Sequence, residues 1–217
     1  MIQMLYKPFQ KWSEKGSVYL IGDTHFDDPD RKFMGYDFSE EVQISRLKER
    51  CHKNDTLIHL GDVGNPEYMN QLKCYKVLIM GNHDKSKTEM EKYFDEVYEG
   101  PLWIAPKIVL SHEPIRITSG FWDEICFNIH GHDHSGWGAS SSDNHLNLAQ
   151  NIAGYLPYNL KHIIEDGTIK RISDIHRVTI DNASLRKTVD RLAETHEEYL
   201  VSKEDLAAAL ELKEGKI

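Results

Sequence analysis

The sequence predicts an α/β domain with buried, mostly parallel strands. Short apolar runs rich in β-branched residues recur along the chain and alternate with segments that have helical periodicity. The chain has 217 residues, of which 40% are hydrophobic, so it is long enough to bury one sizeable core. We therefore expect one compact domain over residues 1–181 and a C-terminal helical extension over residues 182–217.

The expected strands are short apolar runs. Three of them, at 18–23, 56–62 and 75–82, are each followed or ended by glycine and a polar residue, and three later ones lie at 107–112, 125–132 and 145–154. Glycine followed by a polar residue is typical of the turn that ends a strand. A hairpin is also expected at Asp166-Gly167, between strands at 160–165 and 169–175.

The first expected helix lies between the first two strands, over residues 37–55. Asp37 or Ser39 is suited to its N-cap, because a short polar side chain there accepts hydrogen bonds from free backbone N–H groups. Apolar residues recur at i, i+3 and i+7 from Ile44, which places them on one face.

Three further helical segments are expected. Pro66 is a good first residue for a helix after the second strand. Residues 88–100 have a helical pattern that ends in Gly100, a typical C-terminal signal. The extension over 182–217 is helical to its end, and we expect it to pack on the domain, to mediate a homodimer or to cover the site.

Composition limits the class of protein. The formal net charge of −9 disfavours a broad nucleic-acid-binding surface, although a small nucleotide remains possible. The chain has neither an apolar signal segment nor a run long enough to span a membrane. The chain has three widely spaced cysteines and no CxxC pair: Cys51, Cys74 and Cys126. This usage fits a reducing compartment, so we expect a soluble cytoplasmic protein.

Polar side chains suited to metal binding follow five successive expected strands. Because ligands in open α/β sheets bind beyond the carboxyl ends of strands, these groups are expected to converge. A single aspartate or histidine in such a place is usually a turn or core residue, but five in succession are hard to explain that way. The residues are Asp23, His25, Asp62, Asn82, His83, Asp84, His112, His132 and His134.

The ligand chemistry of this set indicates two metal ions. It combines carboxylates, imidazoles and one amide oxygen and contains no thiolate, which suits Mn²⁺ best and also Fe, Zn, Co or Ni. Without His83 and Asp84, the set holds seven candidate ligands, more than the four of one tetrahedral ion. Two divalent ions that share a carboxylate are the simplest solution, and such pairs suit displacement at phosphorus.

The ordered motifs resemble those of the calcineurin-like metallophosphoesterase superfamily. They are Asp-x-His at 23–25, Gly-Asp at 61–62, Gly-Asn-His-Asp at 81–84, the single His112 and Gly-His-x-His at 131–134. The tract at 145–160 also resembles the strand that follows the last motif in small prokaryotic and phage members. The resemblance implies a four-layer αββα sandwich of two mixed β-sheets, with the metals at the strand ends.

The resemblance also assigns the ligands. Asp23, His25 and His134 are implied to hold one metal, and Asn82, His112 and His132 the other, with Asp62 bridging both. It further implies that a metal-bridging water or hydroxide attacks a phosphodiester or phosphomonoester, so that no covalent intermediate forms.

His83 is implied to be the non-ligand histidine that protonates the leaving group or stabilises the transition state. Asp84 follows it and is expected either to orient that ring or to serve as a turn residue. Arg116 is close enough to His112 in sequence to contact a phosphate. His130 is expected to hydrogen-bond a ligand or to fill the end of its strand.

Several alternatives remain open. A metal-dependent nuclease acting on DNA or RNA is the second hypothesis, and a non-catalytic binding protein on the same fold is the third. Serine/threonine phosphatases of this superfamily carry an arginine after the second motif, where it helps to hold the phosphate. Valine follows Asp62 here, so a protein phosphatase is disfavoured. The expected partner is a small phosphoester, with nucleotide-like compounds among the candidates, and no membrane partner is expected.

Overall fold

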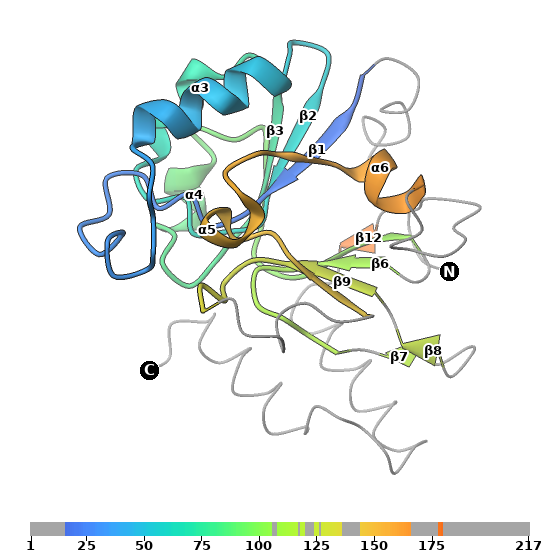
Figure 1. The fold of residues 1–217 in the computed structure, drawn as a ribbon. Helices are drawn as coiled ribbons and strands as arrows, with labels where there is room; N and C mark the ends of the chain where they lie inside the picture. Colours follow the sequence, from blue (N-terminus) through green and yellow to red (C-terminus); the bar gives the residue numbers. More distant parts are fainter. Residues whose placement is uncertain are drawn as a thin grey trace.

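A computed structural model describes the chain over residues 16–105, 108–116, 118–119, 124–125, 127–135, 144–165 and 178–179. Two mixed β-sheets pack against each other, and helices cover the first sheet (Figure 1). The extension over 182–217 and the expected hairpin at 166–167 lie outside the described residues. Among the residues that are described, no helix is long and apolar enough to cross a membrane.

The first sheet has the strand order β11-β1-β2-β3-β4. Its strands β1 to β4 are mutually parallel and the edge strand β11 is antiparallel to β1, so the expectation of mostly parallel strands is confirmed for this sheet. The bounds are β1 Val18–Ile21, β2 Thr56–His59, β3 Tyr75–Ile79, β4 Glu96–Tyr98 and β11 Tyr158–Asn159.

The second sheet has the strand order β10-β9-β6-β5-β12. Here β9 is parallel to both β10 and β6, whereas β5 is antiparallel to β6 and β12. The bounds are β5 Leu102–Ala105, β6 Ile108–Leu110, β9 Phe127–His130, β10 His145–Asn147 and β12 Val178–Thr179. A separate antiparallel pair joins β7 (Thr118–Ser119) to β8 (Glu124–Ile125).

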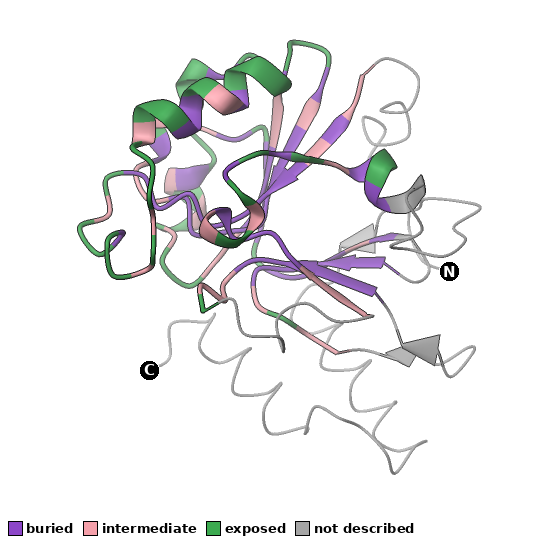
Figure 2. Ribbon diagram, in the orientation of Figure 1, coloured by how far each residue is buried: buried purple, intermediate pink, exposed green. Residues whose placement is uncertain are grey.

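Alternation along the parallel strands divides the core into two layers. In β2, Ile58 points into the layer between the sheets, whereas Leu57 points toward the helices. Ile129 of β9 completes the layer between the sheets, and Leu47 belongs to the layer under the helices. Figure 2 shows the strands of the first sheet mostly buried near its centre and the outer face of α3 exposed, as expected for a sheet covered on both faces.

The helices are shorter than the sequence pattern suggested. Their bounds are α3 Glu40–Arg50, the 3₁₀ helix η1 Pro66–Gln71, α4 Lys87–Met90, α5 Gln150–Ala153 and α6 Leu160–Glu165. Ser39 occupies the N-cap position of α3, although its side chain makes no capping bond. Asn65 caps η1, because its side chain accepts a hydrogen bond from the N–H of Glu67.

The prediction of one helix over 88–100 was wrong in its second half. Only α4 is helical, and Glu96–Tyr98 forms β4 beside β3. All three residues of β4 are buried, and the Glu96 carboxylate accepts hydrogen bonds from the hydroxyls of Tyr75 and Tyr98. Sheet pairing and this buried network outweigh the local helical pattern.

Two further expectations, for residues 145–154 and 160–165, were also wrong in part. Residues 160–165 form α6 and not a strand, because Leu160 and Ile163 lie three residues apart and both pack into the layer between the sheets. The run over 145–154 is a strand only to Asn147 and then continues into α5.

Candidate metal centre

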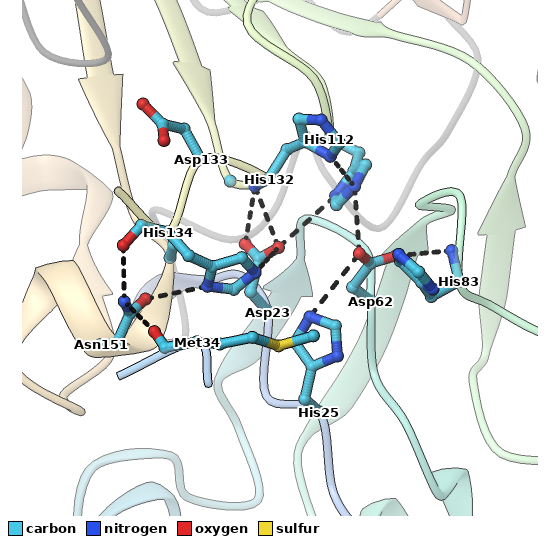
Figure 3. A network of polar contacts seen from close by, with 12 residues as sticks. Asp23, His25, Met34, Asp62, His83, His112, His132, Asp133, His134 and Asn151 are labelled. Atoms are coloured by element: carbon cyan, nitrogen blue, oxygen red, sulfur yellow. Dashed lines mark hydrogen bonds and ion pairs between the residues drawn. The ribbon is translucent and has the colours of Figure 1, made fainter. Parts of the chain in front are cut away.

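The candidate site lies where the ends of both sheets meet. The N–H of Gly22, just after β1, donates to the carbonyl of Leu148 at 3.0 Å, which ties the first sheet to the second. The loops that follow β1, β2, β3, β6 and β9 all reach this junction, and their polar side chains point toward one another (Figure 3). The predicted convergence of strand ends is therefore present in the structure.

The first ligand group consists of Asp23, His25 and His134. Their ligand atoms all lie within 4.8 Å of one another. Nε2 of His134 is 3.7 Å from Oδ1 of Asp23. Asp23 and His25 are buried and His134 is half-buried, so one side of this group faces outward.

The second ligand group consists of Asp62, His112 and His132, again within 4.8 Å of one another. Asn82 joins it, because its Oδ1 lies 2.9 Å from Nε2 of His112 and 3.2 Å from Nδ1 of His132. Those two ring nitrogens are 3.1 Å apart. Three donor atoms from three different loops thus point at one small volume.

Asp62 stands between the two groups. Its Oδ2 lies 3.6 Å from Nε2 of His25 and 3.4 Å from Nε2 of His112 (Figure 3). A carboxylate in this position is suited to contact ions in both groups.

The histidine tautomers leave the correct nitrogens free for a cation. Nδ1 of His25 lies 2.8 Å from the carboxylate of Asp28 and donates to it, whereas Nε2 is buried and makes no hydrogen bond within the described part of the chain. Nδ1 of His112 donates to the carbonyl of Leu60 at 2.8 Å, which directs Nε2 into the cluster. A ligating histidine typically donates its second N–H to a carboxylate or carbonyl, so both rings fit a metal.

Unusual backbone conformations aim the ligands. Asp23, His25, Asp62 and His132 all have φ between 43° and 68°, a left-handed region that non-glycine residues seldom occupy. Such conformations cost free energy and cluster at functional sites. The neighbouring Gly131 allows the close approach, since a Cβ there would lie 1.9 Å from Oδ2 of Asp23.

Electrostatics also favour a bound cation. Burial is the main cause that raises the pKa of Asp23, to about 8. Burial acts to raise the pKa of Asp62 as well, but the hydrogen bond and charge of His112 hold it well below its usual value. Burial opposes the protonation of His112, yet Asp62 and Asp23 outweigh it and raise its pKa to about 9. In the ion-free protein these buried carboxylates rely on protons for the positive charge that a metal would supply.

His83 lies at the exposed side of the cluster. Its backbone N–H donates to Oδ1 of Asp62 at 2.9 Å, and its ring centre is 5.9 Å from that of His25. The His83 residue is exposed, which leaves its ring accessible to a substrate.

Asp84 has a different task from the one suggested by its neighbour. Its carboxylate accepts hydrogen bonds from the N–H groups of Gly81, Asp62 and Val63 at 2.8, 3.0 and 2.8 Å. Both oxygens are therefore occupied by backbone, and Asp84 fixes the loops of Asp62 and Asn82, which fits the expected turn residue and not the alternative of an orienting contact with His83. A carboxylate that accepts several N–H bonds is a strong structural anchor.

Arg116 and His130 lie apart from the ligand groups. Arg116 is half-buried, and no hydrogen bond or ion pair links it to the described ligands. Burial is the main cause that lowers the pKa of His145, and the charge of Arg116 lowers it further. His130 is buried at the end of β9, and its Nδ1 donates to the carbonyl of Gly131 at 2.8 Å. This bond goes to a backbone carbonyl and not to a ligand, so His130 fills the end of its strand, the second of the two expectations for it.

Three residues that were not predicted as site residues support the ligands. Asp28 bonds to His25, the hydroxyl of Tyr36 donates to the carbonyl of Asp23, and Oδ1 of Asn151 accepts from Nδ1 of His134 at 3.0 Å. Asp28 lies three residues after His25, a spacing that is common for contacts within a turn. No local pattern relates Asn151 to a histidine 17 residues away.

A family model and two solved structures resemble this chain. The family model of the calcineurin-like phosphoesterases matches residues 16–178, which is more than half of the chain. A crystal structure of a protein of unknown function from Aquifex aeolicus is similar, with a TM-score of 0.55 and 29% identity, covering 68% of this chain and 97% of that one. The structure of the nuclease MPE from Pseudomonas putida has a TM-score of 0.38 and 22% identity, covering 53% of this chain and 60% of that one. No curated protein matches.

Proposed function

The chain belongs to the calcineurin-like phosphoesterase family, and on that premise we propose that it hydrolyses a phosphodiester or phosphomonoester with two divalent cations. One observation carries the proposal. The two ligand groups lie side by side with Asp62 between them, and the buried Nε2 of His25 makes no hydrogen bond to any described residue, its nearest charged neighbour being Asp62 at 3.6 Å. A buried imidazole nitrogen without a partner is costly unless a cation binds it.

The proposed ligands divide as the geometry groups them. Asp23, His25 and His134 would hold one ion, Asn82, His112 and His132 would hold the second, and Asp62 would contact both. Bound cations would supply Lewis acidity at the phosphoryl oxygens and lower the pKa of an attacking water. The mixed nitrogen and oxygen ligands favour Mn²⁺, with Fe, Zn, Co and Ni as further candidates.

The remaining work falls to His83. Its exposed imidazole stands beside the ligands, and the bond from its N–H to Asp62 fixes its position relative to the centre. In the proposed reaction the ring nitrogen donates a proton to the oxygen of the leaving group. Imidazole suits this step, because its pKa lies near neutral pH.

Hydrolysis of an aryl phosphodiester tests the proposal. We expect Mn²⁺ to support turnover, chelation to abolish it and Asp62→Ala to reduce it strongly, with Asn70→Ala on the exposed side of η1 as a matched control. Turnover that survives chelation, or that is unchanged in Asp62→Ala, would contradict the proposal. A panel of cyclic nucleotides, dinucleotides, nucleotide sugars, phosphomonoesters and single-stranded DNA would then separate small phosphoesters from nucleic acid as the substrate class.

A further inference from the structure

One surface segment contacts the first ligand group from several directions. We call residues 28–36 the clamp segment. Its Asp28 accepts a hydrogen bond from Nδ1 of His25 at 2.8 Å, and the hydroxyl of Tyr36 donates to the carbonyl of Asp23. The clamp segment therefore restrains two of the three ligands in that group directly.

Arg31 strengthens the same restraint. Its buried guanidinium donates to the carbonyls of Thr24 at 2.6 Å and His25 at 3.2 Å, within the turn that carries the ligands. The His25 carbonyl also accepts the N–H of Asp28 at 3.1 Å, so two residues of the clamp segment bind the same turn.

Asn151 extends the restraint to the third ligand. Its Nδ2 donates to the carbonyl of Met34 at 2.8 Å and to that of His134 at 3.0 Å, while its Oδ1 accepts from Nδ1 of His134 at 3.0 Å. Figure 3 shows Asn151 between Met34 and His134, with the Met34 side chain extended along the ligand group. One amide thus fixes the His134 ring and joins it to the clamp segment.

The second ligand group is supported differently. His112 is held by the carbonyl of Leu60, just after the buried strand β2, and Asp62 by the N–H of His83. The Asp84 carboxylate fixes the backbone of that loop. These supports come from buried strand ends and their adjoining turns, not from an excursion across the surface.

The clamp segment buries little apolar surface, and its anchors outside the ligand group are polar, such as the contacts of Arg31 with Gln43 and Glu40 of α3. It contains no helix or strand, and its internal hydrogen bonds are turn contacts such as Phe33 N–H to the Asp30 carbonyl at 2.8 Å. Phe33 is 78% exposed, the most exposed large apolar side chain described. Segments with few buried apolar contacts open locally at low free energy.

We propose that Asn151 and the clamp segment form a positioning device for the first ligand group, so that occupancy of this group and order of residues 28–36 are coupled. The inference rests on the two-metal site of the proposed function but not on turnover. A cation in this group fixes Asp23, His25 and His134, and those ligands in turn fix the clamp segment. Coupling of this kind is reciprocal, so loosening the clamp segment weakens binding of the cation.

The two ions are therefore unequal. The second group stays preorganised by the core, whereas the first group must also order a surface segment when it binds. We expect the first group to have the lower affinity and to release its ion first during dialysis against a chelator.

Calorimetric titration with Mn²⁺, combined with hydrogen exchange of the amides at 28–36, tests the coupling. In the unaltered chain we expect two binding events, with exchange at 28–36 slowing only during the weaker one. Asn151→Ala should weaken that event by about 10–100-fold, as is typical when a group that orients a ligand is removed. The tighter event should be unchanged, and Asn70→Ala should alter neither.

Asn151→Asp separates the two roles of the amide. It keeps an oxygen for Nδ1 of His134 but removes the donor to the carbonyls of Met34 and His134, so we expect metal affinity to be partly rescued while protection of 28–36 is not. If Asn151→Ala does not fold, Tyr36→Phe replaces it, because this change removes only the hydroxyl contact with Asp23. It should then weaken the weaker binding event and leave the tighter one unchanged.

The proposal is overturned if exchange at 28–36 ignores Mn²⁺, or if Asn151→Ala weakens both events equally or neither. These outcomes differ from failure of the proposed function, which would appear as two bound ions, normal coupling and no hydrolysis of any ester.

Discussion

Gly131→Ala tests whether close packing at the end of β9 sets the metal geometry. A Cβ at this position would lie 1.9 Å from Oδ2 of Asp23, whereas contacts under 3.0 Å essentially never occur. The difference, 3.0 minus 1.9, requires a shift of about 1.1 Å between the two groups. Gly131 itself has no left-handed backbone conformation, so sterics alone decide the outcome.

Neither side can move without cost. Asp23 is fully buried, and its two oxygens accept the N–H of His132 at 2.9 and 3.0 Å. Displacing the carboxylate breaks these bonds and removes a ligand from the first group. We expect a loss of about 1–3 kcal/mol in stability from overpacking and a decrease of roughly 10–100-fold in Mn²⁺ affinity.

Gly22→Ala is the matched control. Gly22 directly precedes Asp23, but a Cβ there would meet its nearest atoms at 3.4 Å, an ordinary contact. Calorimetric titration and thermal unfolding of both variants should show normal metal binding for Gly22→Ala only. Equal affinity in Gly131→Ala and the unaltered chain, at equal stability, would refute the steric reasoning.

Three further outcomes follow from the site. Asp84→Asn should lower stability by about 1–3 kcal/mol, measured by denaturant unfolding, because an amide cannot accept all three backbone N–H bonds; unchanged stability would mean that the loops hold without it. His83→Ala should lower kcat on the order of 10²–10⁴-fold while two ions still bind, and a loss of metal instead would show that it supports the ligands. Burial raises the pKa of Asp23 to about 8, and the adjacent carboxylates, against burial, raise that of His112 to about 9, so above pH 6.5 the metal-free folded protein retains protons that the unfolded chain has lost. Its melting temperature should therefore fall as pH rises from 6.5 to 8 in the absence of metal, and a rise over that range would contradict the assignment.

The parallel strands were predictable because their signals are local and strong. The runs that became β1, β2 and β3 are apolar, rich in β-branched residues and followed by glycine and a polar residue. Each run is too short for a typical helix, so a buried strand is the better fit. Residues 88–100 and 160–165 carry weaker patterns that fit either structure. There the partner strand β3 and the layer between the sheets made the choice, and neither is visible in a window of sequence.

The sequence by itself determined the family, the two-sheet α/β architecture and the set of residues with metal-binding chemistry, because each motif needs particular residue types at fixed spacing after a strand. Tertiary structure decided which other residues support them. Asn151 meets His134, Tyr36 meets Asp23 and Asp84 meets three backbone N–H groups only after both sheets have packed. Such contacts depend on distances across the fold, and the hydrogen bonds that orient a ligand leave no periodicity in the chain.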